Sequence, residues 1–294
     1  MGRYCLPLCV QIAHYISNIF RALGVSFTLS LEYLAFAGAV FFIFYFYKKR
    51  KYWYLKIQQR FPENKHIIRE MIYSFTTVII FGLVILPVWW ATNHNITLVY
   101  RPLSKYGYFY YVFSILLMII LHDTYYYWTH RLLHWKKIFR YVHRTHHLSL
   151  NPTPFSAYAL HPVEALLDVS IIPIIVFTIP YHASAVTIFS AYTLGMNVLG
   201  HTGFEFFPSG FTEHKLFKWH NTPTHHNMHH RYVKYNFSIY FNFWDRVMKT
   251  NHPNYDSAFE KVIEQRNTLR TAAIEENDPL EINVSLAEQE ELLN

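Results

Sequence analysis

Three short stretches of the sequence carry most of the chemistry that its side chains can do. The pattern HRLLH begins at residue 130, HRTHH at residue 143 and HNMHH at residue 226. Within each stretch the histidines are three or four residues apart, and on a helix this spacing puts side chains on one face, about 5–6 Å apart. Two imidazoles at that separation can bind one metal ion. Together the stretches offer His130, His134, His143, His146, His147, His226, His229 and His230.

The number of these histidines indicates which metal chemistry they serve. Neutral imidazole is a good ligand for iron, zinc, copper and nickel. Eight imidazoles are more than one four-coordinate zinc ion uses, so the set fits two metals with open coordination positions. A pair of irons can activate dioxygen for attack on an unactivated C–H bond, and lipid chains and sterol rings consist largely of such bonds. The histidines therefore predict an oxygenase that acts on a lipid.

The elements that must position these histidines are strongly apolar. Of the 294 residues, 52% are hydrophobic and only 15% are charged, whereas a soluble protein usually has about 25% charged residues. This deficit and the long apolar runs indicate an integral membrane protein. Much of the net charge of +7 lies in one loop, which is typical of a membrane-topology signal and argues against nucleic-acid binding.

Apolar runs at residues 27–47, 71–90 and 108–121 are the first candidates for membrane spans. A helix rises about 1.5 Å per residue, so some 20 residues cross a hydrocarbon layer of about 30 Å. A further apolar region, 163–199, is interrupted by Pro173 and by Pro180, and it is long enough for a two-span hairpin. We expect an all-α, polytopic membrane protein with about four transmembrane helices.

The distribution of lysine and arginine predicts the orientation of these spans. The loop at 48–69 is strongly basic and is expected in the cytoplasm, whereas the loop at 92–105 has two basic residues and is expected on the other face. The third span then returns the chain to the cytoplasm before residue 130. A hairpin at 163–199 returns the chain to the side that it left, so all three histidine stretches are expected in one cytoplasmic, histidine-rich helical cap.

The order and spacing of the three stretches resemble the three histidine boxes of the fatty acid hydroxylase/sterol desaturase superfamily. NPTPFSAYALHPVEA (151–165) is similar to the segment that follows the second box in sterol C-5 desaturase-type members. GHTGFE (200–205) resembles the motif before the third box, and YNFSIYFNFWDRVMKTN (235–251) resembles the closing segment. The resemblance covers about residues 110–255, and it departs from the family at Lys249, where many members have a glycine that serves a turn.

The resemblance implies a non-haem di-iron oxygenase with four or more membrane helices and a cytoplasmic cap. We expect the chain to have three parts: an N-terminal membrane region with two transmembrane helices (1–107), the catalytic domain (108–255) and an acidic cytoplasmic tail (256–294). The last residues, from 275 onward, are acidic and lack aromatic side chains, so the tail is expected to be solvated.

The resemblance also implies the metal ligands. The eight box histidines match family ligands, His201 matches an additional family histidine, and His225 directly precedes the third box, so that both join the candidates. No catalytic residue beyond the ligands is expected. Five single histidines elsewhere in the chain are expected to be structural, namely His14, His66, His94, His182 and His252.

Four further residues match family positions next to the ligands. His122 and Asp123 match the entrance to the first box, and Asp123 is expected to accept an imidazole N–H and so to fix its tautomer. His161 and Glu164 match an HPxE segment, where support of the ligands or a structural role is expected. For Glu164 the alternative is a favourable charge at a helix N-terminus.

The implied cofactors are two iron ions, for which zinc can substitute in purified protein, and an external electron donor. The sequence has no haem-binding HPGG motif, so electrons are expected from a separate carrier such as cytochrome b5 or a ferredoxin with its reductase. The membrane is expected to be the endoplasmic reticulum of a eukaryote or the inner membrane of a bacterium. Hydroxylation and desaturation both stay open.

A non-catalytic membrane metal-binding or zinc-transport protein is the alternative from another functional class. Such a protein also needs clustered histidines. It is expected to carry Asp, Glu or His inside its spans along an ion path, whereas the clusters here lie at the ends of spans. Iron content and oxygen uptake distinguish the two.

Overall fold

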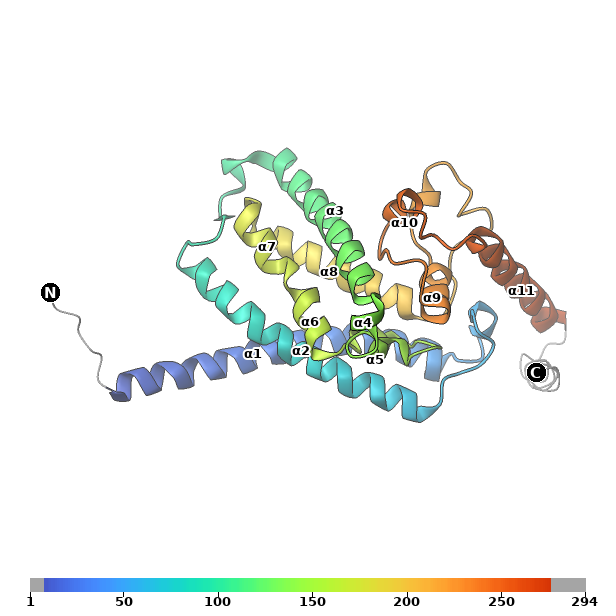
Figure 1. Ribbon diagram of the computed structural model, residues 1–294, viewed down its shortest axis with the longest axis horizontal. Coiled ribbons are helices and arrows are strands. Elements are labelled where there is room, and N and C mark those ends of the chain that lie inside the picture. The colour runs from blue at the N-terminus through green and yellow to red at the C-terminus, as the bar shows by residue number, and fades with distance from the viewer. Residues whose placement is uncertain (1–7, 276–294) are drawn as a thin grey trace.

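The computed structural model describes residues 8–275, and in this part of the chain helices predominate (Figure 1). Within residues 8–275, four helical segments are long and apolar enough to cross a membrane. The first is Phe27–Tyr47, which contains the end of α1 (Leu8–Phe41) and the π-helical turn that follows it. The other three are α2 (Asn64–Asn93), α3 (Gly107–Leu133) and α8 (Ala183–His201). The predicted all-α membrane architecture with four spans is confirmed.

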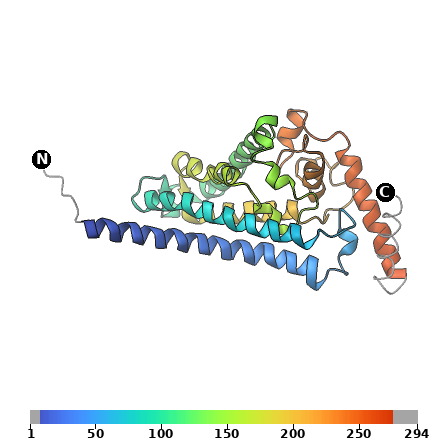
Figure 2. The same ribbon diagram turned by 60° about the horizontal axis from the view of Figure 1, so that its bottom comes forward.

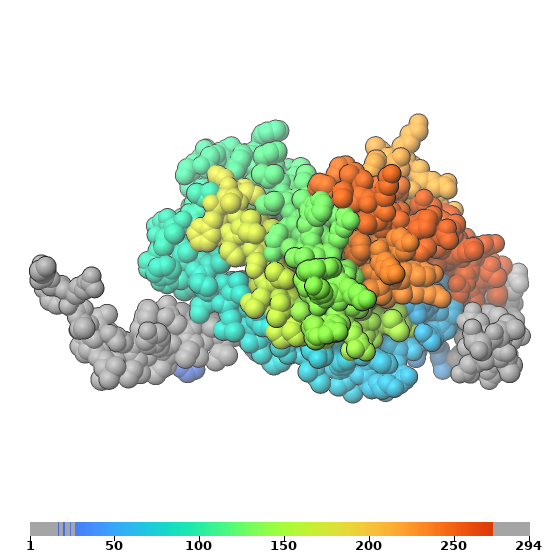
Figure 3. Space-filling view, viewed as in Figure 1, coloured from blue at the N-terminus to red at the C-terminus, as the bar shows by residue number. Residues whose placement is uncertain are grey.

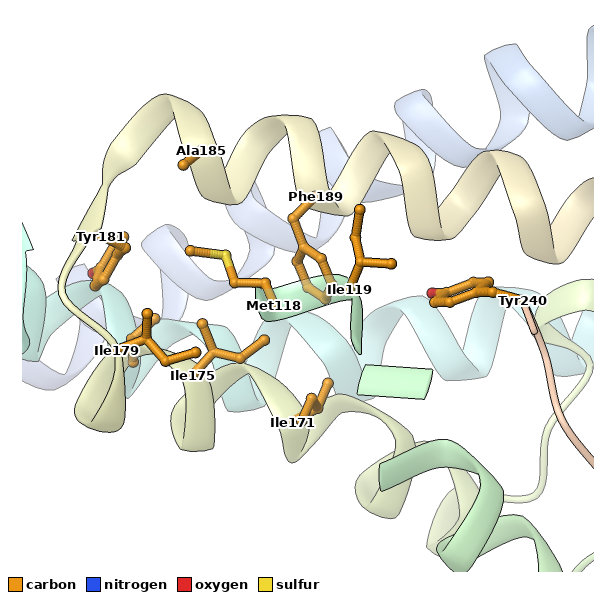
Figure 4. Close-up of a cluster of buried hydrophobic side chains, with 10 residues drawn as sticks. Met118, Ile119, Ile171, Ile175, Ile179, Tyr181, Ala185, Phe189 and Tyr240 are labelled. Atoms are coloured by element: carbon orange, nitrogen blue, oxygen red, sulfur yellow. The ribbon is translucent and has the colours of Figure 1, made fainter. Parts of the chain in front are cut away.

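The four apolar segments lie on two sides of the molecule (Figure 2). α1 and α2 lie side by side and run antiparallel along one side of the molecule (Figure 2). The other side contains α3, α8 and the short helices α6 (Pro162–Val169) and α7 (Ile171–Thr178). Their shared core is apolar, with Met118 of α3, Ile175 of α7 and Phe189 of α8 in one buried cluster (Figure 4).

The region predicted as a hairpin is one, although its first arm is broken into two short helices. α6 ends at Val169. α7 ends at Thr178, because Ile179 precedes Pro180 and is extended, as the residue before a proline usually is. The turn of the hairpin contains β2 (Tyr181–His182), which pairs with β1 (Val99–Tyr100) from the loop between α2 and α3. α8 then returns the chain, so both ends of the hairpin lie at the end of the molecule opposite to β1.

A cap of short elements and one longer helix closes the histidine end of the bundle. In the space-filling view it forms the orange and red surface that packs against α3 and α4, in green (Figure 3). The cap contains η5 (Phe217–Trp219), α9 (Pro223–Tyr232), α10 (Phe243–Val247) and α11 (Tyr255–Glu275). The other short helices of the described residues are η2 (Trp53–Leu55), η3 (Leu103–Lys105), α4 (Lys136–Phe139), α5 (Arg144–His147) and η4 (Pro154–Tyr158).

The first part of the predicted acidic tail forms α11 and belongs to the cap. Tyr255, Phe259 and Ile263 are spaced four residues apart and make an apolar stripe on this otherwise polar helix. They pack with Met228 of α9. Average hydropathy hides a stripe of this kind. The rest of the predicted tail, 276–294, lies outside the described residues.

Lys56 connects the basic loop between α1 and α2 to the histidine end of the bundle through hydrogen bonds. Its side chain is 1% exposed, and Nζ donates to Oδ1 of Asn151 (3.0 Å) and to the carbonyl of Gly203 (3.3 Å). Gly203 has a φ of +71°, and a Cβ at this position would lie 2.7 Å from Nζ. Burial lowers the pKa of Lys56 to about 7, against an opposing effect of the Glu70 carboxylate.

The lowered pKa of Lys56 predicts how stability depends on pH. Between the folded value of about 7 and the usual value of 10.5, the unfolded chain keeps the proton that the folded chain loses. Stability therefore rises with pH in this window, by up to about 1.4 kcal/mol per pH unit. Melting temperatures of wild type and Lys56→Met, measured across the window, should diverge in favour of wild type at high pH. A constant difference would contradict this assignment.

Candidate metal centre

Nine histidines converge in two adjacent groups where α3, α5, α8 and α9 meet. In each group every histidine offers one ring nitrogen, and these nitrogens all lie within 4.8 Å of one another. The nine are the eight box histidines and His201, all of them predicted ligands. The first group is His130, His134, His143, His147 and His229, and the second is His146, His201, His226 and His230.

The second and third boxes are each divided between the two groups. In the second box, His143 and His147, four residues apart, face the first group, while His146 faces the second. The third box repeats this division with the groups exchanged: His226 and His230 face the second, and His229 faces the first. Each HxxHH pattern thus supplies a pair of imidazoles to one group and a single imidazole to the other.

The helix that carries the third box is fixed at its N-terminus by a buried carboxylate. α9 starts with Pro223 at its first position, where proline is favoured, and the Thr222 side chain accepts from the backbone N–H of His225 (3.3 Å). Oε2 of Glu205 accepts from both the backbone N–H (2.9 Å) and the hydroxyl (2.7 Å) of Thr224. Glu205 lies in the GHTGFE motif, but its position in the sequence does not indicate this role.

Four of the nine imidazoles have a fixed tautomer, because their Nδ1 contacts an oxygen that can only accept a hydrogen bond. A ring nitrogen that donates in this way leaves Nε2 with a free lone pair. The four bonds are His130 to Phe237 O (2.7 Å), His143 to Glu164 Oε1 (2.7 Å), His201 to Asn197 O (2.8 Å) and His229 to Tyr235 O (2.7 Å).

The contacts between Nε2 atoms show that these residues fit a metal. Nε2 of His130 and Nε2 of His143 are 3.0 Å apart, although both rings carry their proton on Nδ1. Two lone pairs repel at this distance unless a cation lies between them. Protonation is disfavoured, since burial lowers the pKa of His143 well below its usual range and that of His147 to about 3. A metal ion that accepts neutral imidazole relieves this repulsion.

The position of Glu164 suits both roles that its sequence position suggested. It lies in the first turn of α6, where a negative charge is favourable, and its Oε1 accepts the Nδ1 proton of His143. A carboxylate behind a ligating imidazole fixes the ring and strengthens it as a ligand. His161, by contrast, has a structural position, because its Nδ1 accepts from the backbone N–H of Val163 (3.2 Å) at the start of the same helix.

Replacing Glu164 with alanine is expected to weaken iron binding by roughly 10–100-fold. The His143 ring then loses the acceptor that sets its orientation. Glu164→Gln keeps an acceptor oxygen without the charge, so its affinity should lie between alanine and wild type. Titration of metal-free protein with ferrous iron measures the difference, and equal affinity of the alanine variant and wild type would show that the carboxylate has no such role.

The predicted contact of Asp123 with an imidazole is wrong. Its Oδ1 accepts from the backbone N–H groups of Tyr240 (3.0 Å) and Phe241 (3.2 Å). The neighbouring His122 contacts the Tyr240 hydroxyl through Nδ1 (2.8 Å). Both residues therefore hold the closing segment against α3. They act on the metal centre indirectly, because this segment contains the carbonyl of Phe237.

His225 lies outside both histidine groups. It precedes His226 by one residue and so points in another direction from the helix, with its ring against Tyr255 of α11 and its Nε2 3.8 Å from Oδ2 of Asp245. The structure thus does not support it as a ligand. Asp245 itself is fully buried and accepts from the backbone N–H of Phe237 (3.0 Å), so it positions the carbonyl that receives the proton of His130.

A small cavity borders both groups on the side of the membrane helices. It lies between α3, α6 and α8, and its volume of about 20 Å³ is enough for one water molecule. His130 of the first group and His146 and His201 of the second contribute to its wall, together with Tyr126 and Asp168. The two groups are therefore approached from one common side.

Comparisons with known proteins support the family resemblance that the three histidine boxes indicate. Residues 115–250 match the family model described as fatty acid hydroxylase. The chain is 30% identical over 194 residues (65% of this chain, 58% of the relative) to a Delta(7)-sterol 5(6)-desaturase of Gibberella zeae. It is 26% identical over 267 residues (83% and 80%) to a Delta(7)-sterol 5(6)-desaturase of Aspergillus fumigatus. No solved structure matches the chain.

A human relative covers a shorter part of the chain. The lathosterol oxidase of Homo sapiens is 34% identical over 145 residues, which are 48% of this chain and 46% of that protein. The chain thus spans about half the length of this relative and 58% of the Gibberella zeae protein. The family match over residues 115–250, these relatives and the three histidine boxes support the resemblance of this chain to the fatty acid hydroxylase/sterol desaturase superfamily.

Proposed function

We propose that this chain is a membrane-bound, non-haem di-iron oxygenase that uses dioxygen to hydroxylate or desaturate a lipid of the sterol or fatty-acyl type. The observation that carries the proposal is the division of nine histidines into two adjacent groups that share two boxes. The names of the relatives, sterol desaturase and lathosterol oxidase, support an oxidoreductase that acts on a lipid.

Each histidine group would hold one iron. Bound iron supplies the activation of dioxygen and the removal of hydrogen from a C–H bond. The residues of the chain keep the imidazoles neutral by burial and orient them through Nδ1 acceptors such as Glu164. The cavity between α3, α6 and α8 has room for one water molecule; it marks the membrane side from which a lipid would approach both groups, and a lipid would have to widen it. Zinc is expected to occupy the same ligands in protein purified without added iron.

The histidine end of the bundle is proposed to face the cytoplasm. The basic loop between α1 and α2 carries the topology signal, and Lys56 of this loop contacts Gly203, two residues after His201. The loop and the histidines therefore lie at the same end of the bundle. A separate electron carrier, cytochrome b5 or a ferredoxin with its reductase, would reach the irons from this side, in the endoplasmic reticulum of a eukaryote or the inner membrane of a bacterium.

Untargeted lipid analysis of cells that express wild type or His147→Ala tests the proposed function. A lipid that gains one oxygen atom only with wild type indicates a hydroxylase, and one that loses two hydrogens indicates a desaturase. His225→Gln is the matched control, because this neighbouring histidine lies outside both groups, and it should give the wild-type lipids. Identical lipids from wild type and His147→Ala, with equal amounts of protein in the membrane, would refute the proposal.

A further inference from the structure

A second cavity, separate from the histidine groups, lies where α2 begins. Its volume is about 190 Å³, room for roughly six water molecules at about 30 Å³ each. One wall consists of residues between 60 and 70, and the other consists of residues 148–151, which directly follow the second box. The cavity beside the metal centre is far smaller, at about 20 Å³.

An acidic side chain with an unused oxygen lines the cavity. Glu70 is 0% exposed, and its Oε2 accepts from the hydroxyl of Thr153 (2.5 Å). Its Oε1 has no hydrogen-bond partner within residues 8–275. The Arg69 guanidinium acts on this carboxylate through its charge. The carboxylate in turn acts on the buried Lys56, but Nζ of Lys56 donates to Asn151 and Gly203. A buried carboxylate oxygen without a donor is costly, so a ligand that donates there is favoured.

The outer part of the cavity is basic. Arg60 lines it and has an exposed side chain, and Lys49 lies over the ring of Phe61 at 4.0 Å. Arg69 contacts Nδ1 of His66 (3.1 Å) in the same wall. The other acidic residue at the rim, Glu63, is neutralised by Lys65 at 2.6 Å. The cavity thus offers positive charge outside and negative charge inside, as a zwitterionic ligand requires.

The depth of the cavity indicates where such a ligand comes from. Glu70 directly precedes the apolar run 71–90, which crosses the hydrocarbon layer of about 30 Å. The cavity therefore lies at the level of the lipid headgroups, in the leaflet on the histidine side. We propose that it binds a phosphoethanolamine headgroup, with the primary ammonium on Glu70 and the phosphate on Arg60. The trimethylammonium of choline has no N–H, so it cannot donate to Oε1.

Retention of lipid by the purified full-length chain tests this proposal. Detergent-solubilised protein is incubated with equimolar phosphatidylethanolamine and phosphatidylcholine, and bound lipid is quantified by native mass spectrometry. Wild type should prefer phosphatidylethanolamine. Glu70→Gln should reduce this preference by about tenfold, the effect of one charge-assisted hydrogen bond, while Glu264→Gln, an exposed carboxylate on α11, should leave it unchanged.

Two further arms complete the test. Arg60→Ala, at an exposed position, should weaken retention of both lipids, because both carry the phosphate. If Glu70→Gln does not fold, this variant still tests whether the cavity binds the headgroup. Competition by soluble O-phosphoethanolamine shows whether the free headgroup suffices or the acyl chains are needed. Equal retention of the two lipids by wild type, or no effect of either substitution, overturns the proposal. Iron content is measured in parallel, so the result is independent of the oxygenase activity.

Discussion

Replacing His226 or His229 with alanine is expected to lower lipid oxidation at least about a thousandfold, equivalent to roughly 4 kcal/mol in the activation free energy. The two residues lie three positions apart on α9 but belong to different groups. Each substitution therefore impairs a different metal, and both metals are needed for the proposed chemistry. Iron analysis of the purified variants should show less iron per chain than in wild type.

His225→Gln is the control for this experiment. His225 lies on the same helix as the two ligands, but its ring faces Tyr255 and Asp245, so iron content per folded chain should be unchanged. Membrane insertion of all three variants is compared by extraction into detergent. Retained oxidation in His226→Ala or in His229→Ala would contradict the assignment of its group.

Removing the metals is expected to lower the melting temperature by roughly 10 °C or more. Without a cation, the Nε2 contact of 3.0 Å between His130 and His143 places two lone pairs against each other, because both rings carry their proton on Nδ1. A loss of about 5 kcal/mol of binding free energy corresponds to this shift for a chain of this size. Thermal unfolding in detergent, with and without a chelator, measures it.

The variant that lacks a ligand in each group serves as the reference. In the double variant His226→Ala, His229→Ala, the chelator should shift the melting temperature much less than in wild type. When ferrous iron is added back, the melting temperature of wild type should recover, whereas that of the double variant should not change. A chelator that extracts the metal from wild type without changing its melting temperature would show that the cap is stable without it.

The grouping of the candidate ligands could be predicted from the sequence because their spacing is a property of single helices. Histidines three and four residues apart share a helix face, and the structure brings all eight together. The division of each HxxHH box between two groups could not be predicted, since it depends on how α5 and α9 are rotated towards each other. His225 shows the limit most clearly: one residue of displacement on α9 turns it towards α11.

The residues that orient the ligands were the least predictable part. Three of the Nδ1 acceptors are backbone carbonyls, at Asn197, Tyr235 and Phe237, and a carbonyl leaves no signal in residue type. The partner of Asp123 could not be predicted, because the sequence around Asp123 does not indicate that the closing segment folds over it and donates to its carboxylate. Glu164 could be found since HPxE resembles a family motif.

Exposure of the reduced, iron-loaded chain in lipid nanodiscs to ¹⁸O-labelled dioxygen tests the central claim most directly. The account predicts iron-dependent consumption of dioxygen, coupled to a lipid that either carries the label or has lost two hydrogens while the label appears in water. Neither product should form in His229→Ala. A chain that holds its metals in both groups yet consumes no dioxygen under reducing conditions, with its lipids unchanged, would contradict the claim and favour a metal-binding role.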